Sequence, residues 1–447
     1  MLRTNPQINL SRLHILANNW YNLFIKLHNY AFQGEFTMLN RNKNLSNLSS
    51  GYLFPEITKR KLGYLKTHPE AKIISLGIGN TTEPLTPHIV EGLHAEVAKL
   101  GTKEGYTGYG ADDTGLAALR TQIAEVLYKK LIASDEVFIS DGAKCDIGRI
   151  QYLFGSGVSI AVQDPAYPVY VDGSVMIGAA GPVKADGTGY QGITYMPCTS
   201  ANGFFPDLAS IPSNALVYFC SPNNPTGAVA TRSELASLVK AAKAKGSIII
   251  FDSAYSSFIR DPALPLSIFE IEGARECAIE VSSFSKPIGF TGVRLGWTII
   301  PKELKFADGS SVATDWTRLM TTIFNGASNI AQSGGLASLD SKGLAETREL
   351  TDFYLENAKI IRTTLLGDNF KKAGVEVYGG DNAPYIWAKF AGRKSWEVFD
   401  LILDSCHVVC TPGAGFGPAG ESYIRFSSFG HREQVIEACS RLSRLIL

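Results

Sequence analysis

The sequence predicts an α/β fold built on a mostly parallel β-sheet with helices on both faces. Three short apolar runs that end in polar residues are typical of buried parallel strands, and they occupy residues 216–220, 248–252 and 278–281. A helical pattern at residues 233–245 separates the first two runs, and this alternation of strand and helix favours parallel pairing. A chain of 447 residues can bury a large core and form two domains.

The segments before these strands continue the same pattern. Residues 73–78 indicate a short strand after an N-terminal arm, and Pro87 suits the first turn of a helix of about a dozen residues. Residues 137–144 predict a strand, a glycine turn and the start of a helix. Residues 158–162 predict the next strand of the sheet.

The C-terminal part of the chain predicts a second, smaller domain. Beyond Arg294 we expect a helical region through residues 324–328. A long helix from Thr347 to about residue 366 would link the large domain to the small one. These elements predict four segments: an N-terminal extension at 1–50, an arm that belongs partly to the small domain at 51–86, a large domain at 87–330 and a small domain at 331–447.

Polar side chains stand at the ends of the three strands named first. They are Asn224, Asp252 and Lys286, and because the carboxyl ends of parallel strands meet at one edge of a sheet, we expect them to lie close together. A lysine there can form a Schiff base with an aldehyde. Nearby hydroxyl and guanidinium groups can bind phosphate oxygens: Ser283, Ser285 and Arg294. The alternative for Lys286 is a surface lysine in a loop rich in serine and glycine.

These residue types together suit pyridoxal 5'-phosphate as the cofactor. An aspartate near the pyridine nitrogen keeps that nitrogen protonated, so that the ring can absorb the electrons of a substrate carbanion. Asn224 and Tyr255 can hydrogen-bond the phenolic oxygen of the ring, and Lys286 can hold the aldehyde and later move a proton. Taken alone, a strand-end aspartate such as Asp252 is more often a helix cap or a turn residue.

Further residues suit the binding of anions and of an aromatic ring. Ala143 and Lys144 stand at a predicted helix start, where N–H groups make an anion site; we assign both to a phosphate cradle and Lys144 also to the substrate. The alternative is a plain strand-to-helix connection. Arg425 lies in an alternating strand pattern and can clamp an α-carboxylate, although a strand arginine is ordinarily a solvated charge. Tyr167 can stack on the pyridine ring or simply pack.

Several motifs resemble those of the fold-type I pyridoxal-phosphate aminotransferases. They are NNPTG at residues 223–227, D-x-A-Y at 252–255 and S-F-S-K-x-x-G-x-x-G-x-R-x-G-W at 283–297. The resemblance extends from about Gly51 to the C-terminus. Finer segments are similar to the LL-diaminopimelate aminotransferase subfamily: residues 51–56, 76–84, 109–110, 164–170 and 379–385.

The resemblance implies a seven-stranded sheet, a smaller α+β domain and a homodimer with shared active sites. It places Tyr52 and Gly79 at the substrate, and it places Tyr109 and Asn325 across the dimer interface. It also implies that the substrate contacts four of the residues already named: Lys144, Tyr167, Asn224 and Arg425.

The implied reaction is the interconversion of LL-2,6-diaminopimelate and 2-oxoglutarate with tetrahydrodipicolinate and glutamate, which serves lysine biosynthesis. A polar pocket would hold the distal charges of diaminopimelate, to which Glu83 and Lys144 could contribute. The alternatives are another class I or II aminotransferase acting on lysine, aspartate or aromatic amino acids, a lyase or decarboxylase, and a non-catalytic regulator that binds the cofactor. Residues 1–50 show no helix-turn-helix pattern, which disfavours the regulator.

Composition excludes several classes of partner. Basic and acidic residues number 42 each, so no global field favours nucleic acid or an anionic membrane, and no apolar run approaches the roughly 20 residues that span a bilayer. The 7 scattered cysteines favour reduced thiols in a cytoplasmic protein. The closest group, at residues 406–410, lies in an apolar run, so we predict core packing and no metal.

Residues 1–37 differ from the rest of the chain because they contain one acidic residue, Glu35. An acid-poor, mildly amphipathic leader can be an organelle transit peptide. We favour an overextended start or a disordered tail, since Met38 would be an ordinary start for the part that resembles the family. Targeting to an organelle stays open as the alternative to a cytoplasmic location.

Overall fold

The structure, a computed structural model, describes residues 19–24, 26, 38–48, 53–110 and 113–447. The chain divides into two compact units, residues 1–46 and 47–447. In the first unit residues 19–24 are helical, and a short helical turn, η1 (Lys43–Asn47), crosses the boundary in the sequence. Most of residues 1–37, for which a leader or a tail was predicted, lie outside the described residues, and Tyr52 lies outside them as well.

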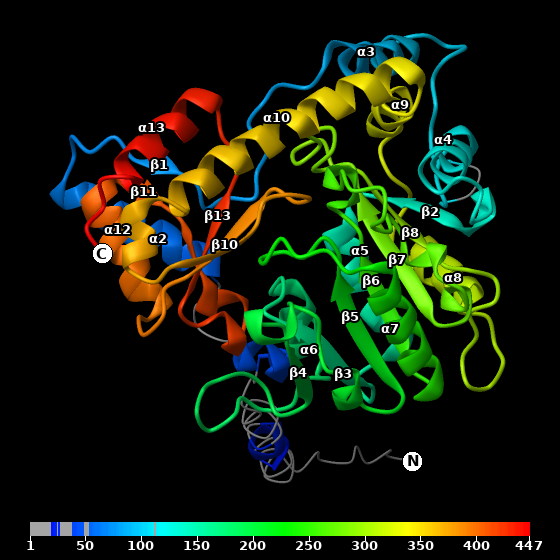
Figure 1. Cartoon of the computed structure of the whole chain (residues 1–447). Helices are drawn as coiled ribbons and strands as arrows, with labels where there is room; N and C mark the ends of the chain where they lie inside the picture. The colour runs from blue at the N-terminus through cyan, green and yellow to red at the C-terminus, as the bar shows by residue number, and fades with distance from the viewer. Residues whose placement is uncertain (1–18, 25, 27–37, 49–52, 111–112) are drawn as a thin grey trace, which may run out of the picture. The chain divides into compact units, whose positions relative to one another are not determined.

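The second unit contains a seven-stranded sheet with the order β2-β8-β7-β6-β5-β3-β4 (Figure 1). Strands β4, β3, β5, β6 and β7 pair in parallel, and β8 runs antiparallel to both β7 and β2. This arrangement confirms the predicted α/β fold with its mostly parallel sheet. The strands are β2 (Val137–Ser140), β3 (Ser159–Asp164), β4 (Ile193–Pro197), β5 (Ala215–Cys220), β6 (Ile248–Asp252), β7 (Ala278–Ser283) and β8 (Gly296–Ile299).

Both faces of this sheet are buried, which explains why its strands are continuous apolar runs. In β5, Val217 and Phe219 pack on one face, whereas Leu216 and Tyr218 pack on the other. Helix α7 (Arg232–Ala244) contributes to the first core, as do α3 (Pro87–Leu100), α4 (Ala117–Gln122) and α9 (Asn329–Ala337). The second core takes residues from α5 (Ala143–Phe154), α6 (Val169–Ile177) and α8 (Val312–Ile323).

A smaller four-stranded antiparallel sheet has its own core near the C-terminus. Its order is β12-β13-β10-β9, and a separate parallel pair joins β1 to β11. Helices α2 (Leu53–Thr67), α12 (Ser395–Cys406) and α13 (Arg432–Leu442) contribute buried residues to this core. The strands are β1 (Ile74–Ser75), β9 (Glu376–Gly379), β10 (Tyr385–Lys389), β11 (Val408–Val409), β12 (Thr411–Pro412) and β13 (Tyr423–Ser427).

A single long helix, α10 (Ser341–Leu365), connects the two sheets (Figure 1). Its Leu350 and Tyr354 belong to the second core of the large sheet, whereas Ala358 and Ile361 belong to the core of the small sheet. The predicted linking helix is therefore confirmed, although it begins six residues earlier than Thr347.

Short helical segments complete the connections. They are α11 (Asp368–Lys372), η2 (Ile123–Leu127), η3 (Ser134–Glu136), η4 (Ser200–Asn202), η5 (Leu208–Ser210), η6 (Ser256–Phe258), η7 (Ile268–Glu270), η8 (Ala274–Glu276), η9 (Gly413–Phe416) and η10 (Pro418–Gly420).

Several local expectations were wrong. The arm includes helix α2, and the strand expected at 73–78 is only β1. The segment after Arg294 begins with strand β8, which pairs with β2 and β7, and Gly296 approaches its neighbours so closely that a Cβ there would lie 2.8 Å from the Cα of Gly142. Residues 324–328 form a loop between α8 and α9. Every residue of β13 is buried, so the alternation expected around Arg425 is absent.

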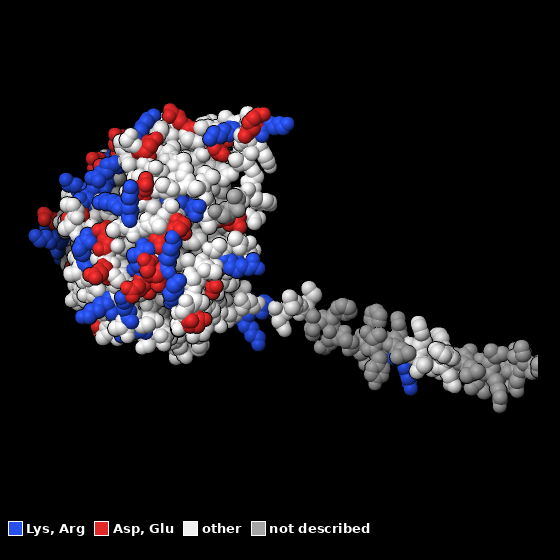
Figure 2. All heavy atoms as spheres, turned by 90° about the vertical axis from the view of Figure 1, so that its right-hand side faces the viewer, with Lys and Arg blue, Asp and Glu red and all other residues white. Residues whose placement is uncertain are grey.

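Surface features of the described residues agree with the balanced composition. On the face drawn in Figure 2, Lys and Arg side chains are interspersed with Asp and Glu.

The described residues hold no group of three or more His, Cys, Asp or Glu side chains that could bind a metal ion, and Cys406 and Cys410 are buried in the small core. None of the helices in the described ranges combines the length and apolar character needed to cross a membrane.

Candidate active site

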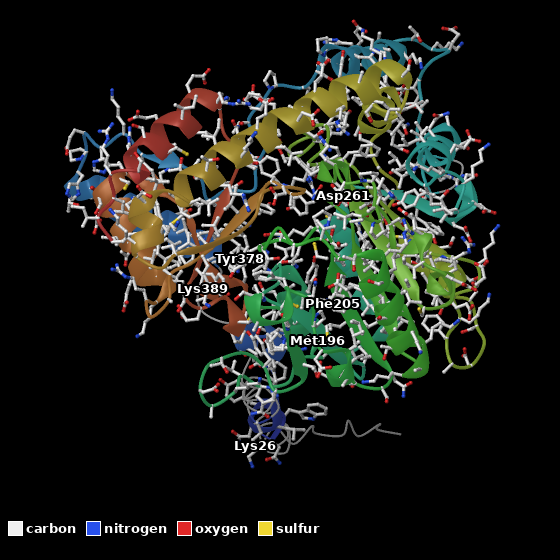
Figure 3. The ribbon with its side chains drawn as sticks, viewed as in Figure 1. Lys26, Met196, Phe205, Asp261, Tyr378 and Lys389 are labelled. Atoms are coloured by element: carbon white, nitrogen blue, oxygen red, sulfur yellow. The ribbon has the colours of Figure 1, made fainter. Side chains whose placement is uncertain are left out.

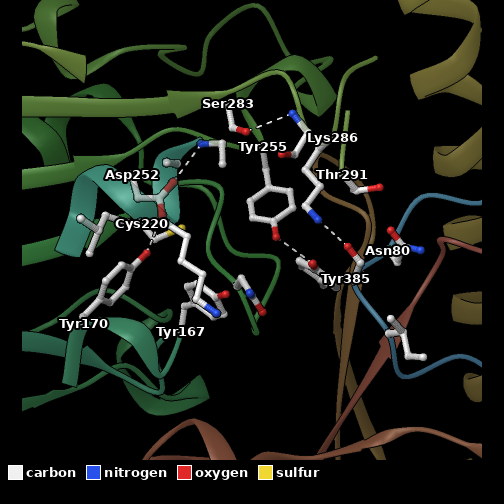
Figure 4. Close-up of a pocket in the computed structure, with 18 of the residues that line it drawn as sticks. Asn80, Tyr167, Tyr170, Cys220, Asp252, Tyr255, Ser283, Lys286, Thr291 and Tyr385 are labelled. Carbon is white, nitrogen blue, oxygen red and sulfur yellow. Dashed lines mark hydrogen bonds between the residues drawn. The ribbon is translucent and has the colours of Figure 1, made fainter. Parts of the chain in front are cut away.

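The ends of β5, β6 and β7 border a cavity of about 340 Å³ (Figure 4). Register places Cys220, the last residue of β5, beside Asp252, the last residue of β6. Most of the residues predicted for the site line this cavity: Gly79, Ala143, Lys144, Tyr167, Asn224, Asp252, Tyr255, Ser283, Ser285, Lys286, Arg294 and Arg425. The fold thus brings together side chains that are spread over most of the sequence.

Tyr109 and Asn325 lie elsewhere, in a second hollow of about 380 Å³ that they line together. Tyr109 has 86% of its surface exposed. Tyr52 lies outside the described residues.

Asp252 is a buried carboxylate held by two donors. The hydroxyl of Tyr170 donates to Oδ2 at 2.7 Å, and the backbone N–H of Ala254 donates to Oδ1 at 3.0 Å. Burial raises the pKa of Asp252, and the hydrogen bond from Tyr170 opposes this rise. The arrangement holds a carboxylate at the strand end with its oxygens fixed in direction.

Lys286 supplies a buried amine close to Asp252. Its Nζ donates to the carbonyl oxygen of Gly79 (Figure 4) and lies 5.6 Å from the ring centroid of Phe429. Burial, together with the positive charges of Arg425 and Arg294, lowers the pKa of Lys286 to about 8, and the charge of Asp252 opposes this shift. A larger share of this amine is therefore neutral near physiological pH than for a solvated lysine, which suits a nucleophile or a base.

An anion cradle lies beside the lysine. Helix α5 begins after Gly142, which has a φ of +128° and leaves the helix without a side-chain cap. A Cβ at Gly142 would lie 2.4 Å from Nη2 of Arg294, and Nη1 of Arg294 donates to Oγ of Ser285 at 3.3 Å. The first N–H groups of a helix attract anions, so the helix start, the guanidinium and the hydroxyl together can hold a phosphate.

Arg425 is a buried cation without an acidic partner among the described residues. Nη1 donates to Oδ1 of Asn224 at 2.7 Å, and Nη2 donates to the carbonyl oxygen of Gly77 at 2.6 Å. In the described part of the chain its Nε has no hydrogen-bond partner, and burial lowers its pKa. Since a buried, uncompensated charge is costly, the site favours an incoming carboxylate.

The cavity also contains residues that sequence reasoning missed. Tyr170 contacts Asp252, and the hydroxyl of Tyr385 lies 2.8 Å from that of Tyr255. Both tyrosines stand in segments that carried the subfamily resemblance, at 164–170 and 379–385, and this was the available signal. Further missed lining residues are Phe54, Ile78, Asn80, Ile147, Cys220, Ala254 and Thr291.

Comparison with known proteins gives a consistent result. The model of the family described as aminotransferase class I and II matches residues 71–442. The chain is 54% identical over 410 residues to the "probable LL-diaminopimelate aminotransferase, chloroplastic" of Oryza sativa subsp. japonica, covering 92% of this chain and 87% of that protein. It is 51% identical over 410 residues to the LL-diaminopimelate aminotransferase of Protochlamydia amoebophila, covering 92% and 98%.

A solved structure is also similar over nearly the whole chain. The L,L-diaminopimelate aminotransferase from Chlamydomonas reinhardtii superposes with a TM-score of 0.86 at 53% identity, covering 91% of this chain and 98% of that one.

Proposed function

The chain belongs to the class I and II aminotransferase family, and we propose that it interconverts LL-2,6-diaminopimelate and 2-oxoglutarate with tetrahydrodipicolinate and glutamate. The observation that carries the reaction type is the presence of Lys286, Asp252 and Arg425 in one cavity. The likeness to relatives named for diaminopimelate supports the choice of substrate. In the biosynthetic direction the reaction would supply lysine.

The residues of the cavity fit pyridoxal 5'-phosphate as the cofactor. Arg294, Ser285 and the start of α5 form the cradle that a phosphate requires. The remaining assignments are Ser283, Ala143 and Lys144 near the phosphate, Asp252 at the pyridine nitrogen, Tyr167 on the ring face, Asn224 and Tyr255 at the phenolic oxygen and Lys286 at the aldehyde. When bound, the cofactor supplies an electron sink for negative charge at the substrate Cα.

The chain's own residues perform binding and proton transfer. Arg425 binds the α-carboxylate with its planar fork, and Asn224 holds Nη1 of that fork in place at 2.7 Å. The neutral amine of Lys286 takes the proton from the substrate Cα, and the lowered pKa of about 8 increases the neutral fraction of this amine. Tyr170 keeps the carboxylate of Asp252 oriented.

The distal end of the substrate needs a polar contact, for which we propose Lys144. Its Nζ lies 6.0 Å from the ring centroid of Tyr167 at the cavity wall. The carboxylate of Glu83 lies against His431, with Oε1 3.0 Å from Nδ1. That contact favours a structural role for Glu83.

A homodimer with shared active sites is part of the proposal. Tyr109 and Asn325 lie together in an exposed hollow rather than along the Lys286 cavity. An exposed tyrosine beside a polar amide suits a role in the partner's site, where Tyr109 would reach the phosphate and Asn325 the substrate. Tyr52 and Gly79 would contact the substrate.

We propose a cytoplasmic location, with organelle import directed by residues 1–37 as the competing possibility. Fusing a fluorescent protein to the whole chain and to a chain that begins at Met38 separates the two. Import that depends on residues 1–37 would overturn the cytoplasmic assignment.

The substrate is tested by the half-reaction with single amino donors, followed by the visible absorbance of the bound cofactor. A change with LL-diaminopimelate, and none with lysine or aspartate, is the expected result. A response to lysine, aspartate or an aromatic amino acid instead would assign the chain to a sister aminotransferase. Release of carbon dioxide or ammonia would indicate a decarboxylase or a lyase.

A further inference from the structure

Tyr385 lines the cavity and points toward Tyr255 (Figure 4). It is the first residue of β10 and is 1% exposed. Its hydroxyl lies 2.8 Å from the hydroxyl of Tyr255. Its ring lies under the guanidinium of Arg425, whose Cζ is 4.5 Å from the ring centroid. One side chain therefore touches the proposed cofactor ligand Tyr255 and the proposed carboxylate clamp.

The turn before Tyr385 is fixed from two directions. Oδ1 of Asn382 accepts from the backbone N–H groups of Arg260 at 2.7 Å and of Asp261 at 3.1 Å, and Figure 3 shows Asp261 beside the end of the β9–β10 hairpin. On the other side, a Cβ at Gly227 would lie 2.4 Å from the carbonyl oxygen of Tyr385. The turn is thus tied to the segment after Tyr255 and to the segment after Asn224.

We propose that Tyr385 is a positioning residue of this site, whose hydroxyl donates to Tyr255 and whose ring supports Arg425. A hydroxyl has one proton to donate, so accepting from Tyr385 leaves the proton of Tyr255 for the phenolic oxygen of the cofactor. Hydrogen bonds in such a chain strengthen one another. This inference rests on the proposed cofactor, but it does not depend on which amino acid is the substrate.

The hydroxyls of Tyr255 and Tyr385 have few other hydrogen-bond partners nearby among the described residues. A Cβ at Gly79 would lie 2.8 Å from the hydroxyl of Tyr385, so that side is closed by backbone. Burial raises the pKa of both tyrosines, so both keep their protons at neutral pH. The charged and titratable groups that face the pair are Arg425 on β13, Cys220 on β5, Asp252 on β6 and Lys286 in the loop after β7.

The test is a pH titration of the visible absorbance of the holoenzyme, without substrate, for wild type and Tyr385→Phe. Losing the hydroxyl weakens the donation from Tyr255, so more negative charge stays on the phenolic oxygen and the cofactor-bound nitrogen of Lys286 holds its proton more tightly. We expect the midpoint of the absorbance titration to lie about half a pH unit higher in Tyr385→Phe than in wild type. A midpoint that is unchanged or falls would overturn the proposal, since a fall would mean that Tyr255 donates to Tyr385 in wild type.

Steady-state kinetics separate the contribution of the Tyr385 hydroxyl from the contribution of its ring. Tyr385→Phe keeps the ring under Arg425, so the KM of the amino donor should stay within about twofold, whereas Tyr385→Leu should raise it about tenfold. Equal KM values for the two variants would contradict the support of Arg425. Tyr218→Phe is the matched control, because it removes a buried hydroxyl that is bonded to Gln151 at 3.1 Å and does not line the cavity; its midpoint should equal that of wild type.

A second variant covers the case in which Tyr385→Phe does not fold. Asn382→Ala removes the acceptor for the N–H groups of Arg260 and Asp261, while Asn382→Asp keeps it. The alanine variant should raise the midpoint and the aspartate variant should leave it nearly unchanged; equal midpoints would count against the proposal. Wild-type protein that has the absorbance band but does not respond to LL-diaminopimelate would refute the proposed substrate alone. Absence of the band would refute the cofactor and this inference together.

Discussion

The hydroxyl of Tyr170 donates to Oδ2 of Asp252 at 2.7 Å and so ties helix α6 to the end of β6. Burial raises the pKa of Asp252, and this hydrogen bond holds it lower. Removing the hydroxyl would raise the pKa further and reduce the negative charge available to a protonated pyridine nitrogen.

Tyr170→Phe should therefore weaken cofactor binding by about three- to tenfold, the effect of one ordinary hydrogen bond. Titration of the apoprotein with pyridoxal 5'-phosphate measures the change in Kd. Tyr218→Phe is the control, because its ring stacks on Tyr170 with centroids 5.2 Å apart but does not contact Asp252. An unaltered Kd for Tyr170→Phe would show that the hydrogen bond from Tyr170 does not tune Asp252 for cofactor binding.

Lys286→Ala should reduce kcat by at least about a thousandfold, because both the covalent attachment and the proton transfer use its Nζ. The variant should still bind the cofactor noncovalently through the cradle of Arg294 and Ser285. Stopped assays of glutamate formation measure the loss, with the exposed Lys240→Ala as a matched control. Turnover near the wild-type rate would remove Lys286 from the mechanism.

Cofactor capture by the apoprotein should depend on pH through Lys286. Its pKa is about 8 in the folded protein, whereas a lysine in the unfolded chain keeps its proton to about pH 10.4. Only the neutral amine attacks an aldehyde, so the capture rate should rise through pH 8 and level off above it. Between these two values the unfolded chain binds more protons, so this group's contribution to apoprotein stability increases with pH.

The charge of Arg425 is one cause of that depressed pKa. Arg425→Met should move the midpoint of the capture profile to higher pH, since a neighbouring positive charge disfavours the charged lysine. Stopped-flow absorbance at several pH values measures the midpoint. A profile that does not move would show that the charge of Arg425 does not contribute to the lowered pKa.

Arg425→Lys should raise the KM of every amino donor by about a hundredfold, because an ammonium group cannot reproduce the fork that Asn224 and Gly77 hold in place. The effect should be similar for LL-diaminopimelate and for 2-oxoglutarate, which both carry an α-carboxylate. Steady-state kinetics at saturating co-substrate measure it. Unchanged KM values would mean that another residue binds this carboxylate.

Mixing two inactive variants tests the shared active site. If Tyr109 serves the partner's site, a hybrid of Lys286→Ala and Tyr109→Ala subunits contains one native site, and random mixing should restore about a quarter of wild-type activity in a two-fold dimer. If Tyr109 serves its own subunit, the mixture stays inactive. Refolding the two variants together and assaying the product gives the answer.

The large sheet could be predicted from sequence because its strands are buried on both faces. Residues 248–252, for example, are a continuous apolar run that ends in Asp252, and the structure has β6 with the same bounds. The edge positions of Asn224, Asp252 and Lys286 followed from the same reasoning, since strand ends meet at one edge.

Other features depend on contacts that local patterns do not contain. Strand β8 was read as part of a helical region, because its place between β2 and β7 is set by close packing at Gly296. Tyr385 meets Tyr255 across 130 residues of sequence, and the turn held by Asn382 brings them together. The residues around Tyr255 and around Tyr385 form no periodic pattern, so local sequence does not predict that these two side chains meet.

Helix α10 also limits how such chains can be recombined. The part of the helix up to Tyr354 fills the core of the large sheet with Leu350 and Tyr354, and the part from Ala358 onward fills the core of the small sheet with Ala358 and Ile361. A chimera that takes its C-terminal part from another aminotransferase, with the junction before or after this helix, therefore sets one part of the helix against a foreign core, whereas a junction between Tyr354 and Ala358 leaves each part with its own core. Swapping substrate specificity by exchanging whole segments would thus require repacking at that helix unless the junction lies inside it, whereas substitutions inside the cavity would not.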